Sequence, residues 1–150
     1  MTAAGRRAVG LDVGEARVGV AVSDEGWLIA SPASMVRRGQ KDLDELRRLV
    51  ASWNAGTVVI GLPRGMSGRE GPQAATVRAF AERLAEALGP EVEIAFWDER
   101  LSTAAAERSL RASGTKRDRK SGEVDAVAAA VILQGWLDAA RFRRDRAGRA

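Results

Sequence analysis

The chain of 150 residues contains no cysteine, no histidine and no tyrosine. The lack of cysteine excludes disulfides, a thiolate metal site and a cysteine nucleophile. The lack of histidine excludes a Ser-His-Asp triad, histidine-ligated zinc and proton transfer by an imidazole. Any catalysis by this chain must therefore depend on carboxylates, lysine, hydroxyl groups or a bound metal ion.

Long apolar runs are also missing. The first ten residues, MTAAGRRAVG, contain a basic pair but no apolar core of a signal peptide, and no stretch of 18 apolar residues follows. We therefore expect neither a signal peptide nor a membrane span. The lack of cysteine fits a reducing compartment, and the predicted location is cytoplasmic.

Length and composition indicate one domain over 1–150, with a core at about 8–140 and a basic tail at 141–150. Hydrophobic residues make up 45% of the chain and charged residues 29%, which is typical of a folded domain. A domain of this length hides roughly 68–70% of its unfolded surface, so its core can be sizeable without disulfides.

The positive charge is concentrated in two segments. Residues 111–120 and 141–150 each contain five basic side chains and one acidic side chain, so each carries +4, while the whole chain carries +4. The rest of the chain is therefore acidic. Such segments favour a polyanionic partner, nucleic acid first. The alternative is a solvated loop and a disordered tail that aid solubility.

The hydrophobic patterns predict the element order β-β-β-α-β-α-β-α-α. The predicted strands are 8–13, 17–23, 57–61 and 92–97, with one more within 27–37 whose extent Pro32 leaves open, and the predicted helices are 42–53, 72–88, 102–112 and 124–140. The Arg-rich segment from 141 is expected to fray. A meander followed by helix–strand alternation indicates an α/β fold with a mixed five-stranded sheet and helices on both faces.

Asp12 is the first acidic residue that packing does not explain. It lies between Leu11 and Val13 in an apolar strand. A strand interior disfavours Asp, and a buried carboxylate is costly unless it is paired or binds a metal. Asp12 is therefore interpreted as a metal ligand, against the alternative that it caps the turn at Gly14.

Two more acidic positions can join Asp12. Asp98 and Glu99 follow a strand, and because neighbouring strand residues face opposite sides, one of them can share the site. The spacing alone does not show which of the two is the ligand. We favour Glu99, because Asp98 could instead cap the next helix or pair with Arg100. Asp125 lies at the start of the last helix, where the helix dipole favours an acid in any case.

Three converging carboxylates repel one another unless a cation lies between them. Mg²⁺ and Mn²⁺ prefer such hard oxygen ligands. Two metals about 3.5–4 Å apart can activate water and stabilise the leaving oxygen of a phosphodiester. Asp12, Glu99 and Asp125 are therefore the candidate catalytic and metal-binding residues.

The candidate substrate contacts are cationic or aromatic. Arg64 could bind a phosphate or be a solvent-exposed loop residue, and Trp97 could stack on a base or belong to the core. The basic loop offers charges that neutralise phosphates. The full set is Arg64, Trp97, Arg100, Lys116, Arg117, Arg119 and Lys120.

Four motifs in this order resemble the YqgF/RuvX family. They are GLDVG at 10–14, VIGLP at 59–63, DERLST at 98–103 and VDAVAA at 124–129, and the resemblance covers about 8–138. DERLST is the most specific of them. One departure is the loop after Gly-Leu-Pro, which has Arg64 where the family usually has Asn, so any function carried by that Asn is in doubt.

The resemblance implies an RNase H-like fold in which Asp12, Glu99 and Asp125 bind a divalent metal, Mg²⁺ or Mn²⁺. It implies cleavage of structured nucleic acid, either 5′-end processing of pre-16S rRNA or resolution of Holliday junctions in branched DNA. Since family members are often dimers, it also implies a homodimer. The choice between RNA and DNA and between endonuclease and exonuclease action stays open.

Two other functions compete with this one. An actin-like ATPase or sugar kinase also begins with Asp-x-Gly, but it needs two lobes, and this chain has room for one and lacks a Walker loop. A non-catalytic RNA-binding factor in ribosome assembly would have the same charge pattern. The three acids argue against it, because carboxylates without a metal repel phosphates.

Overall fold

The protein is described by a computed structural model covering residues 6–64, 69–101 and 121–149, of which 121, 122 and 144–149 are described by their backbone alone. Five strands form one sheet in the order β3-β2-β1-β4-β5. The strands are β1 Arg7–Val13, β2 Arg17–Ser23, β3 Ala30–Arg37, β4 Ala55–Leu62 and β5 Glu93–Asp98; the helices are α1 Asp42–Ser52, α2 Pro72–Leu88, the 3₁₀ turn η1 Glu99–Leu101 and α4 Ser121–Arg149.

The sheet is mixed, as predicted. Strands β1, β2 and β3 form an antiparallel meander, whereas β4 pairs parallel with β1, and β5 pairs parallel with β4. All eight residues of β4 are buried. This burial explains why β4 reads as a continuous apolar run and not as an alternating strand.

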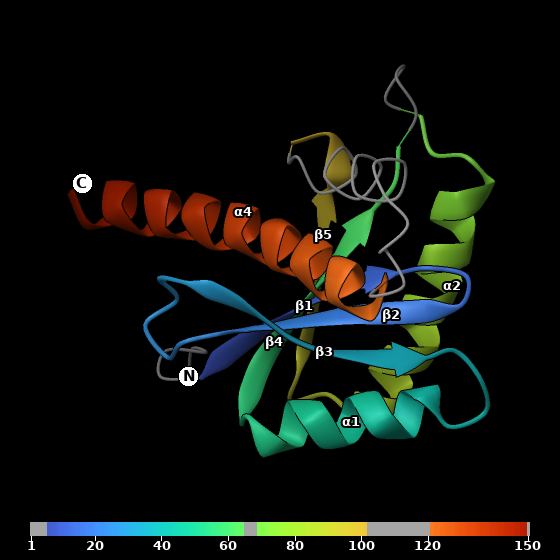
Figure 1. The fold of residues 1–150 in the computed structure, drawn as a ribbon. Coiled ribbons are helices and arrows are strands. Elements are labelled where there is room, and N and C mark those ends of the chain that lie inside the picture. The colour runs from blue at the N-terminus through green and yellow to red at the C-terminus, as the bar shows by residue number, and fades with distance from the viewer. Residues whose placement is uncertain (1–5, 65–68, 102–120, 150) are drawn as a thin grey trace.

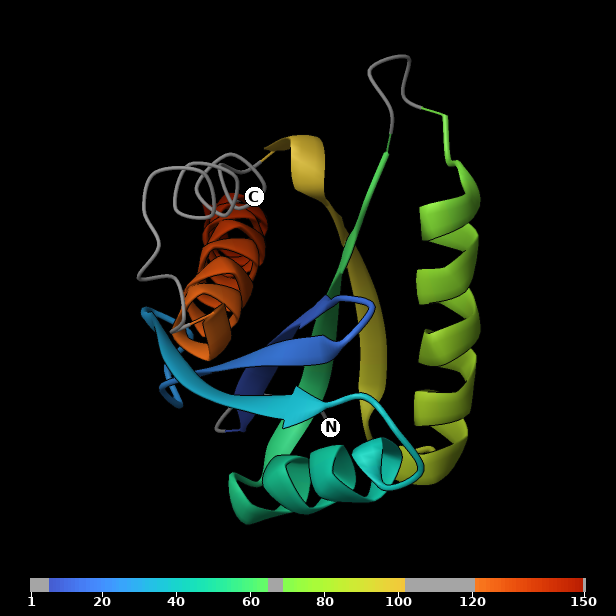
Figure 2. The same ribbon diagram turned by 45° about the vertical axis from the view of Figure 1, so that its right-hand side comes forward.

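The helices cover both faces of the sheet, which confirms the predicted layers. Figure 1 and Figure 2 show α4 across one face and α1 and α2 on the other. Two hydrophobic clusters correspond to the two faces. Val9 and Leu11 face α1 and α2, while Ala8 packs beneath α4 with Leu133, so alternate residues of β1 serve different layers.

The last helix is longer than the sequence indicated. It was expected over 124–140 with a frayed tail, and this expectation is wrong, because α4 begins at Ser121 and continues to Arg149. The tail contains no proline and its one glycine is Gly148, while its arginines and alanines are good helix formers. The predicted helix at 102–112 lies outside the described residues.

The third strand runs from Ala30 to Arg37, within the range of 27–37 in which it was predicted. The preceding turn contains Trp27 in a left-handed conformation with φ of 61°. Its indole N–H donates to the Arg6 carbonyl, and its ring meets Trp136 edge-on. Because tertiary contacts hold Trp27 in place, the residues before Ala30 form a turn instead of extending the strand.

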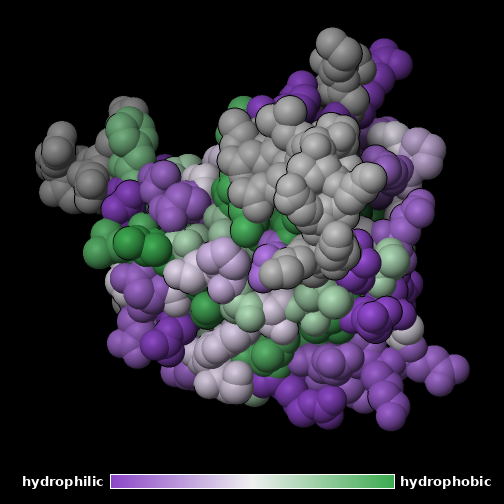
Figure 3. Space-filling model, in the orientation of Figure 1, coloured by the Kyte–Doolittle hydropathy of each residue, from purple (hydrophilic) through white to green (hydrophobic). Residues whose placement is uncertain are grey.

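The surface is mainly hydrophilic on the side of α1, and Figure 3 shows a hydrophobic patch at the left edge, over the turn between β2 and β3. Leu28 and Ile29 of that turn are more than half exposed. Across the described ranges, every helix is too short or too polar to cross a membrane.

The close contact between β1 and α4 can be tested at Gly10. A Cβ there would lie 2.6 Å from the Cβ of Leu133 and 2.9 Å from the carbonyl oxygen of Ala129. Gly10→Ala should therefore lower the free energy of unfolding by about 1–3 kcal/mol, the usual cost of overpacking. Chemical denaturation measures the change.

Gly39→Ala is the matched control, because a Cβ at Gly39 has no heavy atom within 4 Å. We expect the control to change the stability by less than about 0.5 kcal/mol. Equal stabilities for the two variants would contradict the packing described for α4.

Candidate active site

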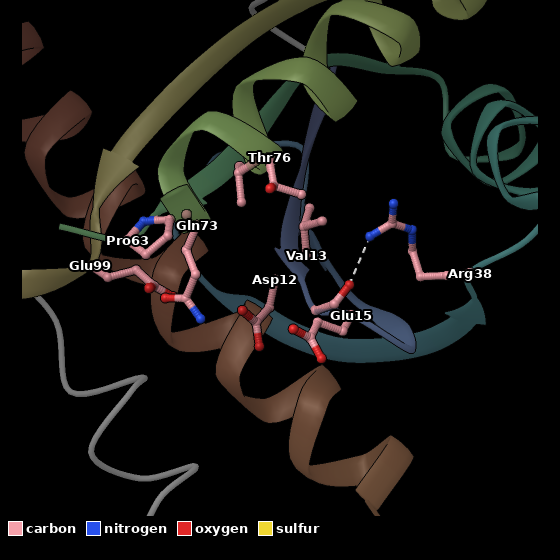
Figure 4. A pocket seen from close by; sticks show the side chains of 11 residues that line it. Asp12, Val13, Glu15, Arg38, Pro63, Gln73, Thr76 and Glu99 are labelled. Carbon is pink, nitrogen blue, oxygen red and sulfur yellow. Dashed lines mark hydrogen bonds between the residues drawn. The ribbon is translucent and has the colours of Figure 1, made fainter. Parts of the chain in front are cut away.

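A pocket opens where β1 and β4 end, beside the start of α2. Figure 4 shows Asp12, Glu99 and Gln73 with their side chains directed toward the same space. The lining residues are Asp12, Val13, Gly14, Glu15, Arg38, Gly61, Pro63, Gln73, Thr76, Val77 and Glu99. Two of the three predicted acids, Asp12 and Glu99, therefore lie in one pocket.

Asp12 is held at the buried end of this pocket. It is 5% exposed and pairs in register with Gly19 of β2. Directly opposed residues of antiparallel strands point to the same face of the sheet. The lack of a side chain at Gly19 therefore leaves room beside the Asp12 carboxylate on the face that α4 covers.

Glu99 reaches the pocket because β5 ends at Asp98 and the chain turns into η1. Its Cγ lies 3.4 Å from where a Cβ of Gly61 would be, so the side chain lies over the end of β4. The preference for Glu99 over Asp98 agrees with this geometry: Glu99 lines the pocket, and the Asp98 carboxylate is bound elsewhere.

Asp125 approaches from α4. The backbone of Asp125 lies directly over Gly19, where an added Cβ would be 2.0 Å from its carbonyl oxygen. Its carboxylate accepts a hydrogen bond of 2.7 Å from Nε of Arg17. Because α4 begins at Ser121, Asp125 lies beyond the first turn, where the helix dipole stabilises an acid less.

The three acids are neighbours, but the structure does not gather them into one cluster. Within 6–64, 69–101 and 121–149, no three acidic side chains lie close enough together to hold a metal ion. The donor set nevertheless suits a divalent cation, since Asp12 and Glu99 supply hard oxygen atoms to one pocket. Asp125 would have to leave Arg17 to join them.

Asp98 lies outside the pocket lining and is surrounded by arginines. Its carboxylate accepts hydrogen bonds from the backbone N–H and the guanidinium of Arg100, and it lies 3.9 Å from Nε of Arg64. The Arg100 guanidinium, helped by the backbone N–H and by Arg64, holds the pKa of Asp98 below its ordinary value. The pairing with Arg100 that the sequence left open is thus observed.

Two of the predicted cationic contacts, Arg64 and Arg100, directly follow Pro63 and Glu99 of the pocket lining in the chain. Arg64 pairs with Glu70 at 3.6 Å and with Asp98, and Glu70 also accepts two hydrogen bonds from Arg78. Arg64 and Arg100 therefore converge on one carboxylate. Lys116, Arg117, Arg119 and Lys120 lie outside the described residues.

Trp97 belongs to the packing between β5 and α4. Its ring lies against Gly135, where an added Cβ would be 2.9 Å from Cζ2. In the described part of the chain, the buried indole N–H of Trp97 has no hydrogen-bond acceptor. The helix thus occupies part of the surface that base stacking would need.

Four polar residues of the pocket were not predicted from the sequence. Glu15 lies in the turn between β1 and β2, Gln73 and Thr76 come from the first turns of α2, and Arg38 directly follows β3. Arg38 donates to the Gly14 carbonyl at 2.8 Å and pairs with Asp42. In the sequence, the spacing of four residues between Arg38 and Asp42 indicates that the two can pair. It does not indicate that Arg38 lines the pocket.

The fold defines the class of protein. A meander of three strands, two further strands parallel to the first and helices on both faces constitute the RNase H-like architecture. The chain belongs to the RuvX family, described as Holliday junction resolvases, whose model matches residues 6–139.

Named relatives with similar sequences support this family membership. A protein of Roseobacter denitrificans is 48% identical over 141 residues, which is 93% of this chain and 86% of the relative. One from Anaeromyxobacter sp. (strain Fw109-5) is 49% identical over 88% of this chain and 96% of its own length. Both carry the name "Putative pre-16S rRNA nuclease".

Two solved structures share the fold. T. thermophilus RuvC in complex with a Holliday junction substrate matches with a TM-score of 0.54 at 13% identity, over 91% of this chain and 96% of RuvC. The fowlpox virus Holliday junction resolvase matches with a TM-score of 0.51 at 10% identity, over 89% and 99% of the two chains. At these identities the likeness shows the fold alone.

The lowered pKa of Asp98 gives a prediction on pH. Arg100→Met should raise the pKa of Asp98 toward the ordinary value of about 3.9. Because the folded pKa is depressed, the pair stabilises the folded protein above that value, and its contribution is lost as pH falls through the folded pKa. Titration of the Asp98 carboxyl carbon by NMR measures the shift.

Arg83→Met is the control, since Arg83 lies on α2 with its guanidinium 5.8 Å from the Phe80 ring centroid. The control should leave the titration of Asp98 unchanged. An Asp98 carboxyl that titrates identically with and without Arg100 would show that the hydrogen bonds between them do not persist in solution.

Proposed function

We propose that this protein is a divalent-metal-dependent nuclease that hydrolyses phosphodiesters in structured nucleic acid. The observation that carries the proposal is that Asp12 and Glu99, from strand ends far apart in the sequence, line one pocket. Membership of the RuvX family and the RNase H-like fold support it. The chain from 1 to 150 acts in this proposal as one nuclease domain.

Asp12, Glu99 and Asp125 are the proposed metal-binding and catalytic residues. Asp12 provides the fixed oxygen ligand, because it lies within β1 and is almost wholly buried. Glu99 contributes its carboxylate from η1, and Asp125 contributes its own from α4. A bound Mg²⁺ or Mn²⁺ would activate water and stabilise the charge that develops on the phosphate.

The remaining residues of the pocket bind and orient. Arg38 fixes the turn after β1 through the Gly14 carbonyl, so that Asp12 keeps its position. Arg64 and Arg100 are proposed phosphate contacts, and a phosphate at the rim would compete with Asp98 for both guanidinium groups. Lys116, Arg117, Arg119 and Lys120 are further proposed phosphate contacts, and Trp97 is the proposed residue for base stacking.

The proposed substrates are a 5′-extended precursor of 16S rRNA and a four-way DNA junction. The first follows the name of the relatives, and the second follows the description of the family. Processing of pre-16S rRNA would place the protein in the cytoplasm. A homodimer stays a prediction; it would suit the two-fold symmetry of a junction, and analytical ultracentrifugation measures it.

Substitution of the buried acid tests the proposal. We expect Asp12→Asn to reduce metal-dependent cleavage by more than about 100-fold, because loss of groups that merely support metal ligands already costs about 10–100-fold. Binding of nucleic acid should change much less. Both substrates, labelled at the 5′ end, are incubated with Mg²⁺, with Mn²⁺ and with EDTA.

Asp44→Asn is the matched control, because it makes the same chemical change at an exposed position of α1, where Asp44 lies 3.7 Å from Arg47. The control should cleave as the wild type does. If the wild type cleaves neither substrate with either metal but still binds them in a salt-sensitive manner, the protein is a nucleic-acid-binding factor and the proposal is wrong.

A further inference from the structure

Arg17 holds one of the proposed metal ligands away from the other two. Its Nε donates to the Asp125 carboxylate at 2.7 Å, and the two side chains are 32% and 16% exposed. Arg17 is the first residue of β2, and its carbonyl accepts a hydrogen bond from Gly14 N–H at the closing turn of the hairpin. The ion pair thus lies on the hairpin side of Asp125.

The register of β1 and β2 fixes where the other acid lies. Asp12 is opposite Gly19, two residues beyond Arg17 on β2, and residues two apart in a strand point to the same face. Asp125 lies over Gly19, which neighbours both Asp12 across the strand pair and Arg17 along β2. Its carboxylate can therefore turn toward Arg17 on one side or toward the Asp12 pocket on the other.

We propose that Arg17 exchanges partners during the reaction, from the Asp125 carboxylate to a phosphate of the substrate. In the metal-free protein its guanidinium binds Asp125. When a divalent cation binds at Asp12 and Glu99, Asp125 joins the cation, and the released guanidinium binds a phosphate of the substrate beside the scissile bond. This inference rests on the proposed nuclease function. It gives the order in which the metal ion, Asp125 and the substrate phosphate come together.

The charges favour such an exchange. An ion pair that is partly exposed to solvent contributes little net stability, so its separation is cheap. A doubly charged cation with two carboxylates attracts a third more strongly than one guanidinium does. The guanidinium has five N–H donors, and the bond to Asp125 uses the one on Nε, so its planar fork remains suited to a phosphate.

An NMR titration observes the exchange without nucleic acid. The Nε–H resonance of Arg17, assigned by its loss in Arg17→Lys, should shift as Mg²⁺ is added, and it should do so at the same Mg²⁺ concentrations as the amides of Asp12 and Glu99. If the amides of Asp12 and Glu99 respond to Mg²⁺ and the Arg17 resonance does not, the exchange does not occur, although the metal site stands.

Substitution gives two effects of opposite sign. By calorimetry, Arg17→Met should bind Mn²⁺ about three- to fivefold more tightly, since the competing ion pair is gone. At saturating metal, the same variant should cleave at least about tenfold more slowly, since a charge-assisted contact to phosphate is lost. A residue needed only for folding would not tighten metal binding.

Arg37→Met is the control, because Arg37 pairs with Arg17 in the β2–β3 register and is exposed, so the same charge is lost on the neighbouring strand. Screening should keep its effect on Mn²⁺ affinity below about twofold. Equal affinities in the Arg17 and Arg37 variants would overturn the exchange. A wild type that binds no Mn²⁺ would instead refute the proposed metal-dependent function, and the inference with it.

Discussion

Helix α4 lies closer to the sheet than strands with full side chains would permit, and the candidate site depends on this closeness. Glycines stand where the two surfaces meet: a Cβ at Gly10, Gly19 or Gly61 would lie within 2.6 Å of an atom of α4. At Gly19 that atom belongs to the backbone of Asp125. The close approach therefore brings an acid of the last helix next to the strand pair that holds Asp12.

Three acids in the neighbourhood of the pocket are each paired with an arginine. Asp98 binds Arg100, Asp42 binds Arg38, and Asp125 binds Arg17. Asp12, Glu15 and Glu99 line the pocket itself. An acidic pocket flanked by arginines suits a substrate that is itself an anion, because the arginines attract phosphates and the carboxylates attract the cation that neutralises them.

The two faces of the sheet are packed with side chains of different size. The face toward α1 and α2 is filled by large aliphatic residues and Phe80, whereas the face toward α4 is built from alanines and glycines with a few larger side chains. Small residues allow the helix to approach at the end of the second face where Asp12 lies, while Gln73 and Thr76 reach the pocket from α2 on the first face. The first face carries the larger apolar side chains, and Val77 of its core also lines the pocket.

The sequence by itself determined the element order, the mixed sheet and the family, because period-two and helical patterns are local and the four motifs stand in fixed order. It also singled out Asp12, since a carboxylate in an apolar strand conflicts with the local pattern. Only the tertiary structure placed Glu99 in the pocket lining and Asp98 against Arg100, because their directions depend on where β5 ends and η1 begins. The pairing of Arg17 with Asp125, 108 residues apart, and the entry of Arg38 and Gln73 into the pocket were likewise decided by the packing of α4 and α2 on the sheet. No local pattern encodes which distant side chains such packing brings together.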